Sequence, residues 1–363
     1  MANTSLDKAR EEINEIDKEM AKLFVRRMRA AEDVAEYKKE RGLSILDSAR
    51  EEEVIRRNSA LIDDDVLREY YVNFLRNNMA VSRAYQSRLM EGMKVAYSGT
   101  EGAFAHIAAE KLYPTAQKIS YGDFASAYRA VESGECDVAV LPVENSYNGE
   151  VGQVTDLMFS GSLYVNGMFD LPVTQDLLAK PGVSIDEIKE VVSHPQALGQ
   201  CAGYIKRYGF VMHEFANTAL AAKWVSESAD RSVAAIGSRE AAEIFGLTVI
   251  DHDINESKSN STRFAIFSRV AGRRVSKDGG VHSILLFTVR NEAGALARAV
   301  DVIGRYGFNM RTLRSRPMKE LLWQYYFYVE VEGNVQSEEG SSLMESLGEF
   351  CDRLKFAGTY IKL

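Results

Sequence analysis

The chain has 363 residues, two to three times the size of a typical domain, so two or three domains are expected. Hydrophobic residues make up 46% and charged residues 26%, and the net charge of −8 argues against a nucleic-acid-binding protein that relies on bulk positive charge. No apolar run approaches the ~18 residues that span a bilayer, and no signal peptide is visible, so a cytoplasmic protein without membrane contact is expected. Three widely spaced cysteines and five scattered histidines predict no disulfide framework and no metal site.

Composition changes near residue 92. About 40% of residues 1–91 are charged, against about 22% of the remainder, and this first segment contains one glycine (Gly42) and no proline. The other glycines and all six prolines follow it. Because glycine and proline interrupt helices, the pattern predicts an all-α domain at residues 1–91 joined to α/β material.

A long first helix is predicted over residues 5–40, where one face repeats at alternating steps of three and four. That face consists of Leu6, Ala9, Ile13, Ile16, Met20, Leu23, Arg27, Ala30, Val34 and Tyr37. The helix would be ~54 Å long, too long to bury this face against two shorter helices of the same chain. A second chain is therefore expected to pack there, and Gly42 is expected to end the helix.

Two shorter helices are predicted at about 47–60, capped by Asp47, and at about 64–90, which opens with three aspartates suited to a helix N-terminus. Polar side chains share faces of the three helices: Arg27 with Lys38, then Asp47, Arg50 and Glu51, then Ser82 with Gln86. Each group alone is typical of a solvated face, and the two cations alone can be long stems along a packed face. Together they favour a cationic pocket for a small polyanion.

Across residues 5–90 the chain resembles chorismate mutases of the all-helical type, which implies the rearrangement of chorismate to prephenate. By this resemblance Lys38 and Gln86 are catalytic and donate to the ether oxygen. The substrate-binding residues are Arg10, Arg27 and Arg50 with Ser82, on the carboxylates, and Asp47 and Glu51, which orient the ring hydroxyl and neighbouring cations. The reaction needs a held conformation and stabilised charge, so no cofactor is expected.

Arg10 adds an independent point about assembly. It lies 17 residues before Arg27, which is ~25 Å along a helix axis. Two such arginines of one helix cannot reach the same small ligand. The sequence therefore predicts a homodimer or higher homo-oligomer in which a second chain completes the mutase site.

From residue 93 the pattern changes to strands, Gly-rich turns and helices. Strands are predicted at 94–98, 136–143, 191–193, 233–236 and 263–268, with a helix at 103–112. Residues 271–281 are the best candidate for a linker. Beyond it, strands at 282–290, 309–315, 323–332 and 357–362 and helices at 294–306 and 337–354 predict an α+β ferredoxin-like (βαββαβ) domain.

Four motifs within residues 94–268 resemble prephenate dehydratase: VAYSGTEGAFAHIAAEKL, LPVENSYNGEV, SHPQALGQC and NSTRFAIFS. The resemblance implies a domain at residues 92–270 with two α/β lobes around a cleft, similar to periplasmic binding proteins. It places Thr262 near the leaving hydroxyl and Asn145 and Gln200 on the substrate, with Glu144 orienting them or supplying acid. Arg263 would bind a carboxylate or form a structural salt bridge, whereas for His194 a local backbone cap is the favoured interpretation.

Residues 282–363 resemble an ACT domain, an amino-acid-sensing module. The regulatory residues implied are Gly294, Ala295 and Leu296 in NEAGALARAV, and Ser315, Arg316 and Pro317 in RSRP. Phenylalanine is the expected ligand. Regulated relatives usually carry Glu where this chain has Arg314, so weaker inhibition is expected, and a dimerisation module without a ligand is the alternative.

The three resemblances together identify the chain as similar to bifunctional chorismate mutase–prephenate dehydratases of the P-protein type. An alternative from another class is a non-catalytic amino-acid sensor, although Lys38, Gln86 and Thr262 would have no use in one. Nearer alternatives are a dehydratase whose helical domain only dimerises, or one that acts on arogenate.

Overall fold

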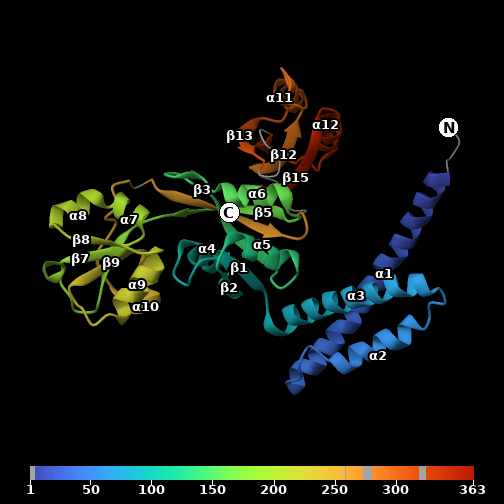
Figure 1. Ribbon diagram of the computed structural model, residues 1–363, viewed down its shortest axis with the longest axis horizontal. Helices are drawn as coiled ribbons and strands as arrows, with labels where there is room; N and C mark the ends of the chain where they lie inside the picture. Colours follow the sequence, from blue (N-terminus) through green and yellow to red (C-terminus); the bar gives the residue numbers. More distant parts are fainter. Residues whose placement is uncertain (1–4, 258, 273–279, 319–323) are drawn as a thin grey trace. The chain divides into compact units, whose positions relative to one another are not determined.

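In the computed structural model, residues 5–257, 259–272, 280–318 and 324–363 are described (Figure 1). The chain divides into two compact units, Met1–Met93 and Lys94–Leu363. Within the described residues, no helix has both the length and the hydropathy that a membrane span requires.

The first unit consists of three helices, α1 (Ser5–Arg41), α2 (Ser48–Ser59) and α3 (Asp65–Glu91). Gly42 ends α1 in the left-handed region, with φ +63°, and Leu43 N–H then donates to the Lys38 carbonyl at 2.9 Å. Asp47 caps α2 as the sequence predicts, because its Oδ1 accepts the Arg50 N–H at 3.0 Å. Asp64 caps α3 in the same way.

The N-terminal half of α1 leaves its apolar face uncovered within this unit. The buried side chains of α1, Met28, Ala31 and Ala35, all lie in its second half, which packs against α3. The face before them is between 44% and 61% exposed at Leu6, Ile13, Ile16, Met20 and Leu23. An apolar face of this length is the kind of surface that another helix covers.

The second unit begins with an α/β lobe around a six-stranded sheet of order β2-β1-β3-β11-β5, with β4 paired to β3. Its elements are β1 (Lys94–Ser98), α4 (Phe104–Leu112), β2 (Gln117–Tyr121), α5 (Phe124–Glu132), β3 (Val138–Asn145), β4 (Gly149–Glu150), α6 (Gly152–Ser160), β5 (Tyr164–Pro172) and β11 (Ser261–Ser268). The strand expected at 136–143 lies two residues later, because Glu144 and Asn145 pair with β11. This shift places motif residues inside the sheet.

A second α/β lobe surrounds a five-stranded sheet of order β10-β6-β9-β7-β8. Its elements are β6 (Asp176–Ala179), the 3₁₀ turn η1 (Ile185–Glu187), β7 (Glu190–Ser193), α7 (Pro195–Gln200), α8 (Ala202–Tyr208), β8 (Val211–Glu214), α9 (Thr218–Glu227), β9 (Val233–Gly237), α10 (Arg239–Phe245) and β10 (Thr248–Asp251). The chain enters this lobe after β5 and leaves it before β11 (Figure 1). Two chain segments therefore join the lobes, as the two-lobed expectation requires.

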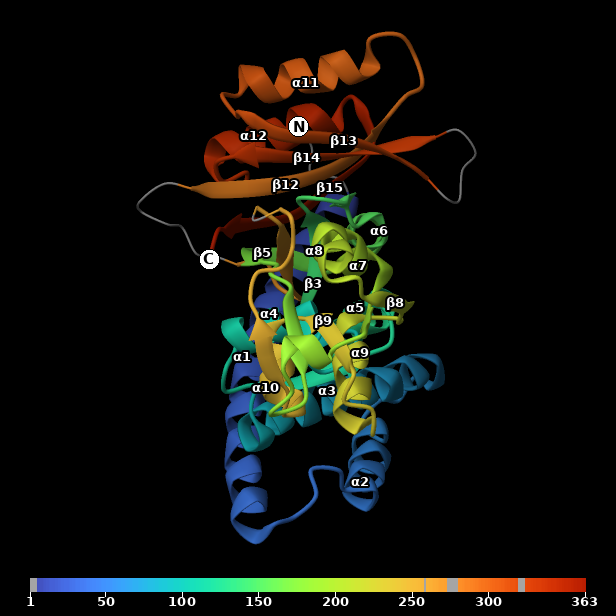
Figure 2. The same ribbon diagram turned by 90° about the vertical axis from the view of Figure 1, so that its left-hand side faces the viewer.

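The C-terminal region is an antiparallel sheet of order β13-β14-β12-β15. Its elements are β12 (Val281–Val289), α11 (Ala295–Arg305), β13 (Met310–Pro317), β14 (Tyr325–Glu332), α12 (Glu338–Gly348) and β15 (Cys351–Ile361). Both helices lie on one face of the sheet (Figure 2). They bury Leu285 and Phe287 of β12, whereas the alternate residues Ile284 and Leu286 face the first lobe.

Two expectations for this region need correction. The helix expected at 337–354 ends at Gly348, and the strand expected from 357 begins at Cys351. The reason is that Cys351 and Leu354 pair with β12, opposite Val289 and Phe287, so the ladder overrides the helical pattern. Residues 273–279 of the expected linker lie outside the described residues, and Val281 already belongs to β12.

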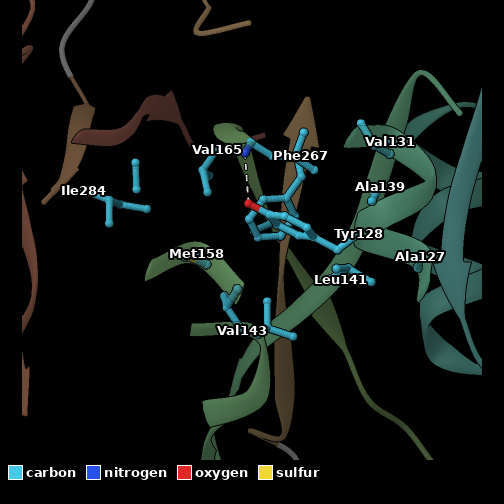
Figure 3. Close-up of a cluster of buried hydrophobic side chains, with 14 of the residues drawn as sticks. Ala127, Tyr128, Val131, Ala139, Leu141, Val143, Met158, Val165, Phe267 and Ile284 are labelled. Atoms are coloured by element: carbon cyan, nitrogen blue, oxygen red, sulfur yellow. Dashed lines mark hydrogen bonds between the residues drawn. The ribbon is translucent and has the colours of Figure 1, made fainter. Parts of the chain in front are cut away.

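The C-terminal sheet and the first lobe share one hydrophobic core. Figure 3 shows the fully buried ring of Tyr128 beside Phe267, with Ile284 of the C-terminal sheet in the same cluster. The Tyr128 hydroxyl accepts a hydrogen bond from Leu163 N–H at 3.0 Å. At Gly358 of β15, with φ +137°, an added Cβ would overlap the backbone of Val165 in β5. The sheet is therefore packed directly against the lobe.

Candidate active sites

In the helical unit, Arg27 of α1 contacts Ser82 of α3, and Gln86 lies one helical turn further along α3. The Arg27 guanidinium donates to the Ser82 hydroxyl and to the Asn78 carbonyl, at 3.3 Å for the latter. Burial lowers the pKa of Arg27. Gln86 is 8% exposed, and its buried Oε1 has no hydrogen-bond partner among the described residues. A partly buried cation on Ser82 and an unused buried amide on the same helix, α3, suit an anionic, oxygen-rich ligand.

The other predicted mutase residues lie around the turn between α1 and α2 and along α2. Lys38 Nζ donates to the Ile45 carbonyl at 2.5 Å, and Arg50 pairs with Glu53 at 2.6 Å on the helix surface. Glu51 forms an ion pair with Arg83 of α3, a residue that sequence reasoning missed. Arg10 is exposed on the N-terminal half of α1.

A cavity of about 350 Å³ lies between the two α/β lobes. The first lobe contributes the strand residues Asn145 and Thr262, and the second contributes Gln200. The remaining lining residues are Ala103, Phe104, Asn148, Gly149, Glu150, Val151, Val173, Gln175, His194, Gln196, Ala197, Ala216, Asn217 and Thr218. Three of the predicted dehydratase residues thus meet in one cavity.

Asn145 and Thr262 are opposite each other on β3 and β11. The Asn145 amide donates to Thr262 Oγ1 at 2.9 Å and to Asn260 Oδ1 at 2.9 Å. Its carbonyl oxygen accepts from the backbone N–H groups of Tyr147 and Asn148, both at 3.0 Å. Because Thr262 Oγ1 accepts from Asn145, its own hydroxyl proton is left to donate to a ligand.

Two buried glutamines supply further polar groups at the cavity. Gln200 is 7% exposed, and neither its Oε1 nor its Nε2 has a partner among the described residues. Gln175 is 2% exposed with an unpartnered Oε1, and sequence reasoning missed it because it lies outside all four motifs. Buried amides without partners are costly, so both suit hydrogen bonds to a bound molecule.

Helices α4 and α9 both begin at this cavity. Ala103 and Phe104 are at the start of α4, which has no side-chain cap, and Asn217 and Thr218 are at the start of α9. The first N–H groups of a helix carry partial positive charge and bind anions. The cavity therefore favours a ligand with carboxylate groups.

Glu144 and Arg263 lie outside the cavity, contrary to the roles expected for them there. Glu144 comes directly before Asn145 on β3, and Arg263 comes directly after Thr262 on β11. Because side chains alternate along a strand, both point to the opposite face of the sheet. Arg263 pairs with Asp170 at 2.8 Å and with Glu144 at 3.6 Å, and the Asp170 hydrogen bond raises the pKa of Arg263. Glu144 also pairs with Arg314 of β13. Arg263 thus forms the salt bridge that the sequence left as an alternative.

His194 caps α7, as the sequence favoured. Its Nδ1 accepts the Gln196 N–H at 3.2 Å, so one ring nitrogen is already engaged by the backbone. The residue also lines the cavity.

The predicted regulatory residues are divided between several places. Ala295 and Leu296 line a cavity of about 500 Å³ that also contains Arg290, Glu292 and Tyr325. Gly294, with φ +80°, is the residue before α11. Ser315 and Arg316 lie on β13, and Pro317 lines a separate cavity of about 280 Å³ beside α6.

Two family models match the chain: chorismate mutase type II over residues 9–87 and prephenate dehydratase over residues 95–271. The bifunctional chorismate mutase/prephenate dehydratase of Neisseria gonorrhoeae is 31% identical over 358 residues, covering 97% of this chain and 95% of that protein.

The chain belongs to the bifunctional chorismate mutase/prephenate dehydratase family.

Two further relatives each match about three quarters of this family member. Arogenate dehydratase/prephenate dehydratase 2 of Arabidopsis thaliana is 33% identical over 281 residues, 74% of this chain and 72% of its own. The crystal structure of prephenate dehydratase from Arthrobacter aurescens in complex with L-Phe is 26% identical with a TM-score of 0.68, covering 74% of this chain and 90% of that one. Among the residues that the structure describes, no cluster of His, Cys, Asp or Glu could hold a metal ion.

Proposed function

We propose that this chain rearranges chorismate to prephenate and then converts prephenate to phenylpyruvate, with a mutase domain at residues 1–91 and a dehydratase domain at 92–270. The observation that carries the proposal is the pair Asn145 and Thr262, joined by a hydrogen bond in a cavity rich in amides and helix N-termini. Full-length similarity to bifunctional relatives supports the two activities in one chain.

In the mutase reaction the enzyme holds a dicarboxylate in a compact conformation. Arg27, supported by Ser82, binds one carboxylate in the contact between α1 and α3, and Arg50 and a partner subunit's arginine bind the rest. Gln86 and Lys38 donate to the ether oxygen as its bond breaks and negative charge develops there. Asp47 and Glu51 orient the ring hydroxyl and the neighbouring cations. No nucleophile and no cofactor takes part.

In the dehydratase reaction a ring hydroxyl and a ring carboxylate leave together, and aromatisation drives the step. Thr262 donates its hydroxyl proton in a hydrogen bond to the leaving oxygen, because Asn145 already occupies its acceptor side. Asn145 and Gln200 position the substrate. The starts of α4 and α9 bind its carboxylates. Closure of the two lobes, in the manner of periplasmic binding proteins, would exclude water from the reacting groups.

Residues 282–363 form, in this proposal, a ferredoxin-like ACT domain that binds phenylalanine as a feedback inhibitor. The strand and helix order and the sheet order β13-β14-β12-β15 support it. Support for the ligand comes from the Arthrobacter aurescens relative, which was crystallised with L-Phe. The ligand would contact the segments 294–296 and 315–317. The protein acts as a cytoplasmic homodimer or higher homo-oligomer whose partner chains cover the exposed face of α1.

The direct test is to incubate the purified chain with chorismate and to follow prephenate and phenylpyruvate separately. We expect prephenate to rise first and phenylpyruvate to follow. Added prephenate and added arogenate are compared as dehydratase substrates, and turnover of arogenate alone would replace the second half of the proposal. Consumption of neither chorismate nor prephenate would refute the proposal.

A further inference from the structure

One side of the dehydratase cavity is the short turn formed by β4 and Val151, at the end of the LPVENSYNGEV motif. Gly149, Glu150 and Val151 of this turn all line the cavity. Val151 N–H donates to the Val143 carbonyl at 2.9 Å, which ties the turn to β3, the strand that carries Asn145. Glu150 Oε1 is buried without a hydrogen-bond partner among the described residues.

The opposite side of this turn is held by Arg316 of the C-terminal sheet. Its guanidinium binds Asp156 of α6 through two nitrogens, Nε at 3.1 Å from Oδ1 and Nη2 at 3.3 Å from Oδ2. Its third nitrogen, Nη1, is 3.8 Å from Glu150 Oε2. Tyr326 Oη donates to the same Asp156 at 2.7 Å. The Arg316 side chain is 23% exposed, so these pairs are partly shielded from water.

Gly152, the first residue of α6, provides the space for this arrangement. A Cβ built on Gly152 would occupy the position of the Arg316 guanidinium. A cation is unfavourable at a helix N-terminus, and the carboxylates of Asp156 and Glu150 offset that cost here. The arrangement around Arg316 of the C-terminal sheet thus depends on three residues of the first lobe, Glu150, Gly152 and Asp156.

The other end of α6 is bound by the same sheet. Lys355 of β15 donates to the carbonyl oxygens of Met158 and Gly161, and Arg353 donates to that of Phe159 at 3.5 Å. These carbonyls lie at the C-terminal end of α6, where basic groups are favourable. Helix α6 is therefore fixed at both ends by the C-terminal sheet, and Val151, the residue before its N-terminal end, lines the cavity.

We propose that Arg316 is a positioning residue for the dehydratase reaction, which fixes the turn carrying Glu150 against the cavity from the C-terminal sheet. This inference rests on the proposed dehydratase activity and goes beyond a ligand-binding role for Arg316. It makes the C-terminal sheet part of the dehydratase site even when no amino acid is bound. A misplacement of ~1 Å in a cavity wall can lower a rate ~10²-fold, so loss of Arg316 is expected to act mainly on kcat.

The test compares Arg316→Ala, Arg316→Lys and Gly152→Ala in the full chain, with Arg311→Ala as the matched control. Arg311 lies on the same strand, and among the described residues it forms an ion pair within the C-terminal sheet, with Glu332 at 3.2 Å. For Arg316→Ala we expect kcat on prephenate to fall ~10- to 100-fold with a smaller change in KM. Arg316→Lys should recover part of the lost kcat, because lysine keeps the positive charge but lacks the planar guanidinium that binds both carboxylate oxygens. Gly152→Ala should lower kcat as well, since it displaces the guanidinium.

Mutase activity and the thermal midpoint are measured on the same preparations without added amino acid. A wild-type kcat in both Arg316→Ala and Gly152→Ala would overturn the inference, as would a loss of kcat equal to that of Arg311→Ala. A lower thermal midpoint with an unchanged kcat below it would assign Arg316 a purely structural role. An inactive wild-type chain would instead refute the proposed function.

Discussion

Thr262→Val is the substitution that isolates the proposed hydrogen bond to the leaving hydroxyl. Valine keeps the size and β-branched shape of threonine and removes its single hydroxyl. We expect dehydratase kcat to fall ~10²- to 10³-fold, the effect typical of removing one donor to developing charge. Chorismate consumption should remain at the wild-type rate, because Thr262 belongs to the second compact unit.

The structure also sets the cost of this change to stability. The Asn145 amide loses Thr262 as an acceptor but keeps Asn260 Oδ1 at 2.9 Å and the Ser261 carbonyl at 3.2 Å. The Asn145 donor therefore keeps partners, so the free energy of unfolding should fall by only about 1 kcal/mol. The loss of rate would then far exceed any loss of folded protein at 25 °C.

The assay follows prephenate and phenylpyruvate after chorismate is added. With Thr262→Val, prephenate should accumulate. Thr262→Ser, which keeps the hydroxyl, should restore most of the rate, and Thr248→Val on the exposed start of β10 is the matched control. Formation of phenylpyruvate at the wild-type rate by Thr262→Val would refute the role of the hydroxyl.

Gln86→Ala should lower mutase kcat by ~10²-fold or more and leave the turnover of added prephenate intact; parallel loss of both activities would contradict separate sites. Mixing Arg10→Ala with Arg27→Ala chains under conditions that exchange subunits should restore part of the mutase activity that each lacks alone, and no restoration would contradict a shared site. Burial lowers the pKa of Lys355 to about 8 from 10.5, so between these pH values the unfolded chain binds more protons than the folded one. The contribution of Lys355 to stability should therefore rise as pH increases from about 8 to 10.5. Over this range the thermal midpoint of wild type should increase relative to that of Lys355→Met. A constant difference between the two midpoints would contradict this.

Local patterns in the sequence predict much of the fold. The bounds of α1, α2 and α3 agree with the helical periodicity to within one or two residues, because capping residues such as Asp47 and Gly42 act on their own neighbours. The predicted end of α12 was wrong because Cys351 pairs with β12, a strand that is distant in the sequence. Propensity cannot report such a long-range ladder.

The candidate sites show the same division between local motifs and long-range contacts. Asn145, Gln200 and Thr262 are in motifs, and the structure brings them to one cavity. Glu144 and Arg263 belong to the same motifs, but strand alternation turns them to the other face, where Glu144 pairs with Arg314 and Arg263 pairs with Asp170. Gln175 lines the cavity from outside the motifs, and Glu150 lies inside a motif that implied no role for it, so only the packing of the two lobes and the C-terminal sheet could reveal their places.

The central claim is that one chain carries two separate active sites that act in sequence. The most direct measurement mixes the variants Gln86→Ala and Thr262→Val and follows phenylpyruvate after addition of chorismate. Each variant alone should form little phenylpyruvate, and the mixture should form it through prephenate released by Thr262→Val and consumed by Gln86→Ala. If the mixture forms no more phenylpyruvate than the two variants do separately, although prephenate accumulates, the claim of two separate sites is contradicted.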